Sequence, residues 1–111
     1  MIEHQLTKYR LFEMFRKLEL SRSISRRATM YNFVTGPHCL ASVTTKTSAT
    51  ELCIEIVGEA LQLLGANGLT HEYPMEKIMR DARASLIEDG ENHVLKMKGG
   101  AWLSECFREN A

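Results

Sequence analysis

Apolar residues recur every three or four positions through most of this chain, which is the spacing of one face of an α-helix. The clearest row comprises Leu40, Val43, Thr47, Thr50, Ile54, Val57, Leu61 and Leu64. Its steps alternate between three and four, as in a heptad seam. A second row beside it widens the apolar surface: Ala49, Cys53, Ile56, Ala60 and Leu63. The two rows predict a long helix with neighbours on two sides, with Cys53 as a small buried hydrophobe.

Glycines and prolines divide the rest of the pattern into three more helices. The first is predicted over about 2–32, where apolar residues form two stripes. Gly65 is suited to end the second helix, because glycine readily adopts the left-handed conformation that closes a helix C-terminus. Pro74 suits the first turn of a third helix, Gly90 ends it, and Asn92 is placed to cap the fourth. Alternating period-two runs are absent, so the predicted fold class is all-α, a helical bundle of two long and two shorter helices.

The length of 111 residues corresponds to one domain, 1–111, and 44% hydrophobic with 25% charged residues is typical of a globular chain. So short a chain cannot cover long helices that are apolar on more than one face. We therefore expect a homo-oligomer, a dimer or tetramer, whose interface resembles the core of a bundle.

Charge gives little support to a nucleic-acid partner, because 14 basic residues balance 14 acidic ones. Arg22, Arg26 and Arg27 lie at helical spacing, and a solvated or ion-paired helix face is favoured over phosphate contacts. Uninterrupted apolar stretches are only a few residues long, whereas a spanning helix needs roughly 18 to 20. We expect no membrane span and no signal peptide.

The cysteines and histidines indicate neither a disulfide framework nor a metal site. Three cysteines lie far apart without paired spacing, which favours a reducing compartment such as the cytoplasm. A di-iron bundle needs a Glu-x-x-His pair, and no glutamate here has a histidine three residues later. His38 beside Cys39 makes at most a weak ligand pair.

A more specific signal lies between Ala60 and Leu95, where residues keep the register of a known family pattern. That pattern is Ala-x-Gln-x-x-Gly-Gly-x-Gly, a short spacer, x-Pro-x-Glu-Lys-x-x-Arg-Asp-Ala, and then Ile-x-Glu-Gly. The matching residues are Ala60, Gln62, Gly65, Gly68, Pro74, Glu76, Lys77, Arg80, Asp81, Ala82, Ile87 and Gly90. Over nearly all its length the chain resembles the C-terminal helical domain of the acyl-CoA dehydrogenases.

The resemblance implies a role within a larger enzyme. The full-length family enzyme is an FAD-dependent oxidoreductase that introduces an α,β double bond into an acyl-CoA thioester and passes electrons to electron-transferring flavoprotein. Its C-terminal domain supplies subunit contacts and part of the FAD and substrate site. The family's flavin-binding β-domain has no counterpart in this sequence, so the chain alone is not expected to bind FAD or oxidise an acyl-CoA. The expected location is the cytoplasm, or the mitochondrial matrix in a eukaryote.

The resemblance also implies cofactor-binding positions. Gln62 and the loop of Gly65, Ala66, Asn67 and Gly68 match a segment that approaches the FAD of a neighbouring subunit in the family. Glycine permits such close backbone approach, although Ala66 here replaces the second glycine of the pattern. A helix end followed by a tight turn is the alternative role for this loop.

Asp89 matches the position where many family members carry the glutamate that removes the α-proton of the thioester. Aspartate is one methylene shorter, and the alternative is an acidic turn whose charge favours the N-terminus of the last helix. Glu91 and His93 replace residues that often contact flavin. The alternative for the whole chain is a stand-alone, non-catalytic oligomerisation or interaction module derived from that family.

Overall fold

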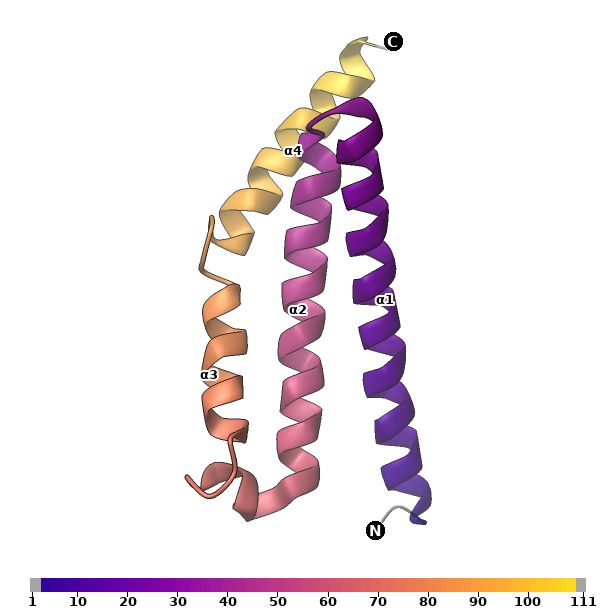
Figure 1. The fold of residues 1–111 in the computed structure, drawn as a ribbon. Helices are drawn as coiled ribbons and strands as arrows, with labels where there is room; N and C mark the ends of the chain where they lie inside the picture. The colour runs from indigo at the N-terminus through magenta and orange to yellow at the C-terminus, as the bar shows by residue number, and fades with distance from the viewer. Residues whose placement is uncertain (1–2, 110–111) are drawn as a thin grey trace.

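The computed structural model describes residues 3–109 and shows helices only in that range (Figure 1). The elements in chain order are α1 (Gln5–Thr35), α2 (Cys39–Leu64), the 3₁₀ helix η1 (Gly65–Leu69), α3 (Met75–Ser85) and α4 (Asn92–Glu109). The predicted all-α fold with two long and two shorter helices is therefore confirmed.

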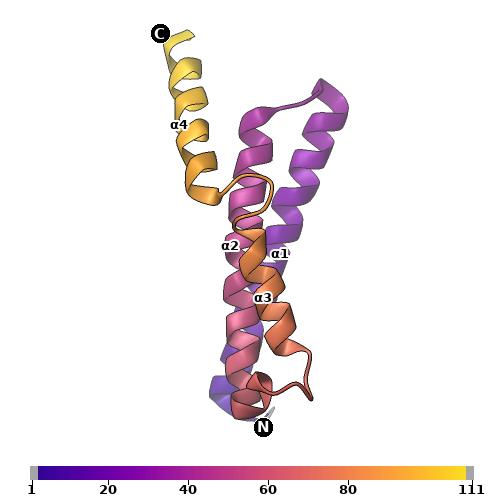
Figure 2. The same cartoon turned by 90° about the vertical axis from the view of Figure 1, so that its left-hand side faces the viewer.

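Helix α2 is the centre of the arrangement. It runs antiparallel to α1 on one side, while α3 and α4 follow one another back along its other side (Figure 1). Among the described residues, α1 contacts α2 but neither α3 nor α4. Helix α4 tilts away from α2 toward its own C-terminus (Figure 2). The bundle is therefore open, with α1 and the α3–α4 pair separated by a single helix.

The open arrangement leaves the chain elongated and its core small. It measures 55 × 26 × 24 Å with a radius of gyration of 17.3 Å, against about 13 Å for a compact domain of this length. The buried apolar residues in the described part are Ala28, Ala41, Val57 and Ala82. The accessible area is 8103 Å², whereas a monomer of 12.6 kDa is expected to expose about 6,200 Å². A surplus of about 1,900 Å² therefore stays uncovered.

Many of the exposed large apolar residues lie on α1. Phe33 is 86% exposed and Val34 71%, and Tyr9, Phe12 and Phe15 are each more than half exposed. The apolar stripes predicted for the first helix lie on α1, but α2 covers only part of them. The prediction for Cys53 is wrong, because this residue of α2 is exposed.

The helix ends follow local sequence signals, with one correction. Gly36 and Gly65 have φ angles of 86° and 62° and end α1 and α2. Asn92 was predicted to cap α4, but its side chain turns toward α2 instead. The Glu91 Oε2 atom accepts the Val94 N–H at 3.2 Å and takes the capping role.

One described segment, Cys39–Leu69, is long and apolar enough to cross a membrane by length and composition, because its most apolar 18-residue window has a mean hydropathy of 1.3. It contains α2, which contacts α1, α3 and α4. Two of its carboxylates pair with α1, Glu55 with Lys17 at 3.1 Å and Glu59 with Arg10 at 3.7 Å. We interpret this segment as the central helix of the domain, and the absence of a membrane span stays a prediction.

Candidate functional site

The loop after α2 is a helix end that closes on itself. The Gly65 N–H donates to the Gln62 carbonyl, and the Thr70 N–H and hydroxyl both donate to the Asn67 carbonyl, at 3.2 and 2.8 Å. Gly68 is buried, and a Cβ there would lie 2.7 Å from Leu61 Cδ1 and 3.2 Å from the Leu61 carbonyl oxygen. Packing against α2 is therefore enough to explain the glycine at position 68.

The outer side of the same loop borders a cavity of about 410 Å³. Its lining residues are Gly58, Leu61, Gln62, Gly65, Ala66 and Leu69. The Gln62 side chain is exposed, and nothing lies within 4 Å of a Cβ built on Gly65. The lining offers one amide, backbone groups and an apolar wall, with no basic side chain to meet a diphosphate. A cofactor such as FAD would therefore need most of its contacts, those to its diphosphate above all, from other protein.

Asp89 lies in the turn between α3 and α4, with an unusual backbone. Asp89 and Gly90 have φ angles of 54° and 99°, and aspartate is among the few residues that tolerate this region. The Leu95 side chain covers Gly90, because a Cβ at that position would lie 2.9 Å from Leu95 Cδ2. Asp89 itself is exposed. The turn thus presents the carboxylate to solvent, next to a glycine that has the Leu95 side chain beside it.

Glu91 and His93 bind one another beside this turn. The His93 Nδ1 and Glu91 Oε1 atoms are 2.8 Å apart. The hydrogen bond with His93 and the donated backbone N–H groups of His93 and Val94 lower the pKa of Glu91 to about 2. Glu91 therefore stays a carboxylate at the N-terminus of α4, as the alternative of an acidic turn predicts for this residue.

A polar network that the sequence analysis missed ties this turn to α2. The Lys46 ammonium donates to the Gly90 carbonyl at 2.8 Å and to Asn92 Oδ1 at 2.6 Å. The Asn92 amide donates to Thr50 Oγ1 at 2.9 Å, and Asn92 is only 4% exposed. One feature of the sequence could have indicated this network: Lys46 is the only charged residue from 39 to 50.

The structure places the predicted site residues in two groups rather than one. Gln62 lies in the last turn of α2 and residues 65–68 in η1, both before α3, whereas Asp89, Glu91 and His93 follow the end of α3. Figure 1 shows α3 between these two parts of the chain. The 11 residues of α3, roughly 16 Å of helix, lie between the two groups along the chain. They do not converge on one small ligand.

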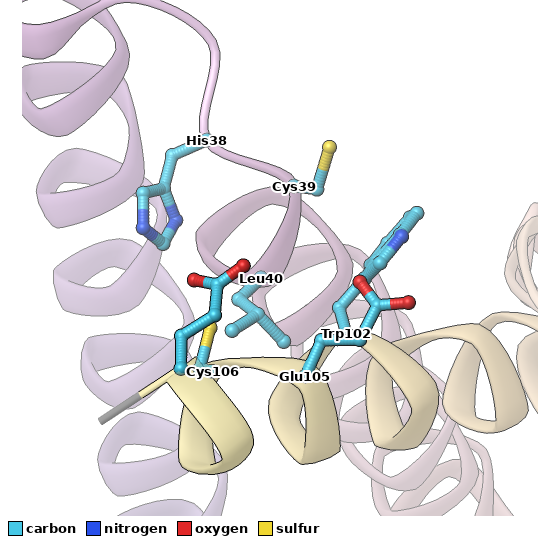
Figure 3. Close-up of a pocket in the computed structure, with 7 residues that line it drawn as sticks. His38, Cys39, Leu40, Trp102, Glu105 and Cys106 are labelled. Atoms are coloured by element: carbon cyan, nitrogen blue, oxygen red, sulfur yellow. The ribbon is translucent and has the colours of Figure 1, made fainter. Parts of the chain in front are cut away.

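A second hollow, of about 200 Å³, lies between the start of α2 and the last turns of α4 (Figure 3). His38 and Cys39 come from one side, and Trp102, Glu105 and Cys106 from the other. The Cys39 thiol points away from the α4 side chains (Figure 3). In residues 3–109, no three His, Cys, Asp or Glu side chains are arranged to hold a metal ion.

The described residues thus form a helical domain in which one central helix contacts all the others and large apolar side chains are exposed. The chain matches the family model described as "Acyl-CoA dehydrogenase, C-terminal domain" over residues 1–103. It therefore belongs to the acyl-CoA dehydrogenase C-terminal domain family, as the resemblance in the sequence indicated.

The relatives include complete enzymes much longer than this chain. A short-chain specific acyl-CoA dehydrogenase of Megasphaera elsdenii is 30% identical over 100 residues, covering 89% of this chain and 26% of the relative. The mitochondrial short-chain specific acyl-CoA dehydrogenase of Bos taurus is 29% identical over 104 residues, covering 94% and 25%. The chain thus spans about a quarter of the length of these relatives.

Solved structures show the same fold. Butyryl-CoA dehydrogenase from Megasphaera elsdenii superposes with a TM-score of 0.87 at 27% identity, covering 92% of this chain and 27% of that one. A chain from work on the electron transferring flavoprotein of Acidaminococcus fermentans and flavin-based electron bifurcation gives 0.86, again at 27% identity with coverage of 92% and 27%.

Proposed function

We propose that this chain acts as the C-terminal helical part of an FAD-dependent acyl-CoA dehydrogenase. In that enzyme it supplies subunit contacts, one edge of the FAD site and the Asp89 carboxylate as the base for the acyl-CoA substrate. The observation that carries the proposal is the family match over residues 1–103. The proposed location is the cytoplasm, or the mitochondrial matrix in a eukaryote, and the proposed electron acceptor is an electron-transferring flavoprotein.

The uncovered surface supports a role inside a larger assembly. A surplus of about 1,900 Å² on each chain would bury about 3,800 Å² in a symmetric dimer, which falls in the range of obligate interfaces. The aromatic residues exposed along α1 are the kind that such interfaces bury. A homo-oligomer, a dimer or tetramer, is therefore part of the proposal.

The separation of the two residue groups is compatible with two different sites. The cavity beside Gln62 and Gly65 faces outward at one end of α3, where a cofactor held mainly by other protein can reach it. Asp89 faces outward at the other end. The loop would then serve the FAD of one active site, and Asp89 the substrate of another.

The proposed role of Asp89 is to remove a proton from the substrate. Bound FAD would supply the oxidising power by accepting the hydride from the β-carbon. The Asp89 carboxylate would take the α-proton of the thioester, and its exposure leaves it accessible to a substrate brought by the rest of the enzyme. Positioned general bases typically contribute about 10²–10⁴-fold in rate.

One observation favours the alternative of a non-catalytic oligomerisation or interaction module. Gly68 is explained by packing on Leu61, and Glu91 by capping α4, so two proposed site positions have structural roles without any cofactor.

Sequencing the source DNA upstream of Met1 is the first test. A reading frame that continues into a flavin-binding domain supports the proposal, and a frame without one supports the module. In the complete protein, Asp89→Asn should lower turnover of acyl-CoA substrates by at least about 100-fold. The matched control is Glu88→Gln, which removes the neighbouring exposed carboxylate and should leave turnover unchanged. Wild-type turnover in Asp89→Asn on every acyl-CoA tested would refute the role of Asp89.

A further inference from the structure

We propose that Lys46 is a positioning residue that anchors the α3–α4 turn on α2 and thereby sets the location of the Asp89 carboxylate. The inference rests on the proposed function, because it gives the turn a purpose in proton removal. The anchoring itself is a property of the described residues and can be tested without any cofactor.

Lys46 holds the turn at two points on the C-terminal side of Asp89. Its ammonium donates to the Gly90 carbonyl at 2.8 Å and to Asn92 Oδ1 at 2.6 Å. Hydrogen bonds from a charged donor are roughly twice as strong as neutral ones. The Gly90–Glu91 peptide, one residue beyond Asp89, is therefore held by a charge on another helix.

The network has one consistent arrangement of donors and acceptors. Asn92 accepts from Lys46 through Oδ1 and donates to Thr50 Oγ1 through its amide nitrogen. The Thr50 hydroxyl donates in turn to the Lys46 carbonyl at 2.6 Å. Lys46 and Thr50 are four residues apart and share one face of α2. Because Asn92 is 4% exposed, breaking this ring would leave buried polar groups without partners.

The turn needs such an anchor because its backbone is otherwise permissive. Gly90 has a φ of 99°, and glycine can leave that conformation at little steric cost. On the N-terminal side of Asp89, the Leu86 carbonyl accepts a hydrogen bond from the Asn92 N–H at 3.1 Å, and this bond closes the turn on α3. With Lys46 bound, the residues on both sides of Asp89 are held. Proton transfer depends on this, since a misplacement of about 1 Å can cost about 100-fold in rate.

The first experiment measures the anchoring in the 111-residue chain. Lys46→Met keeps most of the side-chain length and removes the ammonium, and the readout is amide hydrogen exchange of Asn92, whose N–H closes the turn. Exchange should become at least about tenfold faster than in the wild type, while amides in the centre of α2 keep their rates. Lys98→Met, on the exposed face of α4, is the control and should change neither. Unchanged exchange at Asn92 in Lys46→Met would overturn the proposal.

Two further variants keep the test decisive if Lys46→Met does not fold. Thr50→Val preserves the shape of the side chain and removes the acceptor of the Asn92 amide, so Asn92 exchange should accelerate in the same direction by a smaller factor. Lys46→Arg keeps a charged donor and should restore most of the protection. Wild-type exchange in Thr50→Val would count against the network.

The second experiment measures the catalytic consequence in the complete flavoprotein. Lys46→Met should lower kcat by about 10- to 100-fold with KM nearly unchanged, and Lys46→Arg should recover part of the loss. An inactive Asp89→Asn together with a normal kcat in Lys46→Met would overturn this inference alone. A fully active Asp89→Asn would overturn the proposed function, and with it the catalytic purpose of the anchor.

Discussion

Gly68 and Gly100 offer the same substitution in two environments, with opposite expected effects on stability. An alanine Cβ at position 68 would lie 2.7 Å from Leu61 Cδ1, and 3.2 Å from both the Leu61 carbonyl oxygen and Leu64 Cβ. The Leu61 methyl can rotate away, but the other two atoms move only with α2, and overpacking of this kind costs about 1–3 kcal/mol. The lower backbone entropy of unfolded alanine offsets about 0.4–1 kcal/mol. Gly68→Ala should therefore lose about 1–2 kcal/mol net.

The matched control is Gly100→Ala in the exposed interior of α4, where nothing lies within 4 Å of the added Cβ. It should gain about 0.5–1 kcal/mol, because alanine is the better helix former. Far-ultraviolet circular dichroism during thermal unfolding should give a Tm about 4–10 °C lower for Gly68→Ala and a few degrees higher for Gly100→Ala. Protein concentration must be equal in all runs, since association alters Tm. A Gly68→Ala variant as stable as the wild type would refute the packing explanation and return Gly68 to the cofactor candidates.

Three further predictions concern the network, the α4 cap and the surface of α1. Asn92→Ala should lower the free energy of unfolding by about 2–3 kcal/mol in urea, because Lys46 loses one of two acceptors, and a loss under about 1 kcal/mol would contradict this. The pKa of Glu91 is lowered from 4.5 to about 2, so its contribution to stability is complete above pH 4.5 and is lost as the pH falls toward 2. Carboxyl-carbon NMR titration checks this, and a midpoint near 4.5 would show that the bond to His93 does not form. Phe33→Asp, at an 86% exposed position, should weaken self-association at least about tenfold in sedimentation without unfolding the chain, and an unchanged dissociation constant would place the interface elsewhere.

The helices could be predicted from the sequence because their signals are local. The heptad row from Leu40 to Leu64 lies within α2 (Cys39–Leu64), and Gly65 ends it with the positive φ that glycine allows. The first helix extends to Thr35, three residues beyond the predicted end, because Gly36 rather than the end of the apolar stripes stops it.

The site could be predicted only in part because its contacts are distant in sequence. Asparagine is a residue type that often caps helices. In this fold, however, the Asn92 side chain accepts a hydrogen bond from the ammonium of Lys46, which lies 46 positions away in the sequence. No local sequence pattern predicts a hydrogen-bond partner so distant in the chain. The prediction that Cys53 is buried was wrong for a related reason. The apolar period shows which face of α2 favours burial, but it does not show whether this chain supplies a helix that covers this face.

The two ends of α3 differ in how much of their structure this chain provides. The Asp89 turn is held by Lys46, by the Leu95 side chain and by the Leu86 carbonyl, all within the described residues. The cavity beside Gln62 has a wall on one side only, and its polar groups face outward. Preorganisation of a general base needs rigid support before substrate arrives, whereas a cofactor edge can be completed by a second protein surface. The proposed division of labour therefore places the geometry of proton removal inside this chain and leaves the affinity for FAD to the protein that covers its open face.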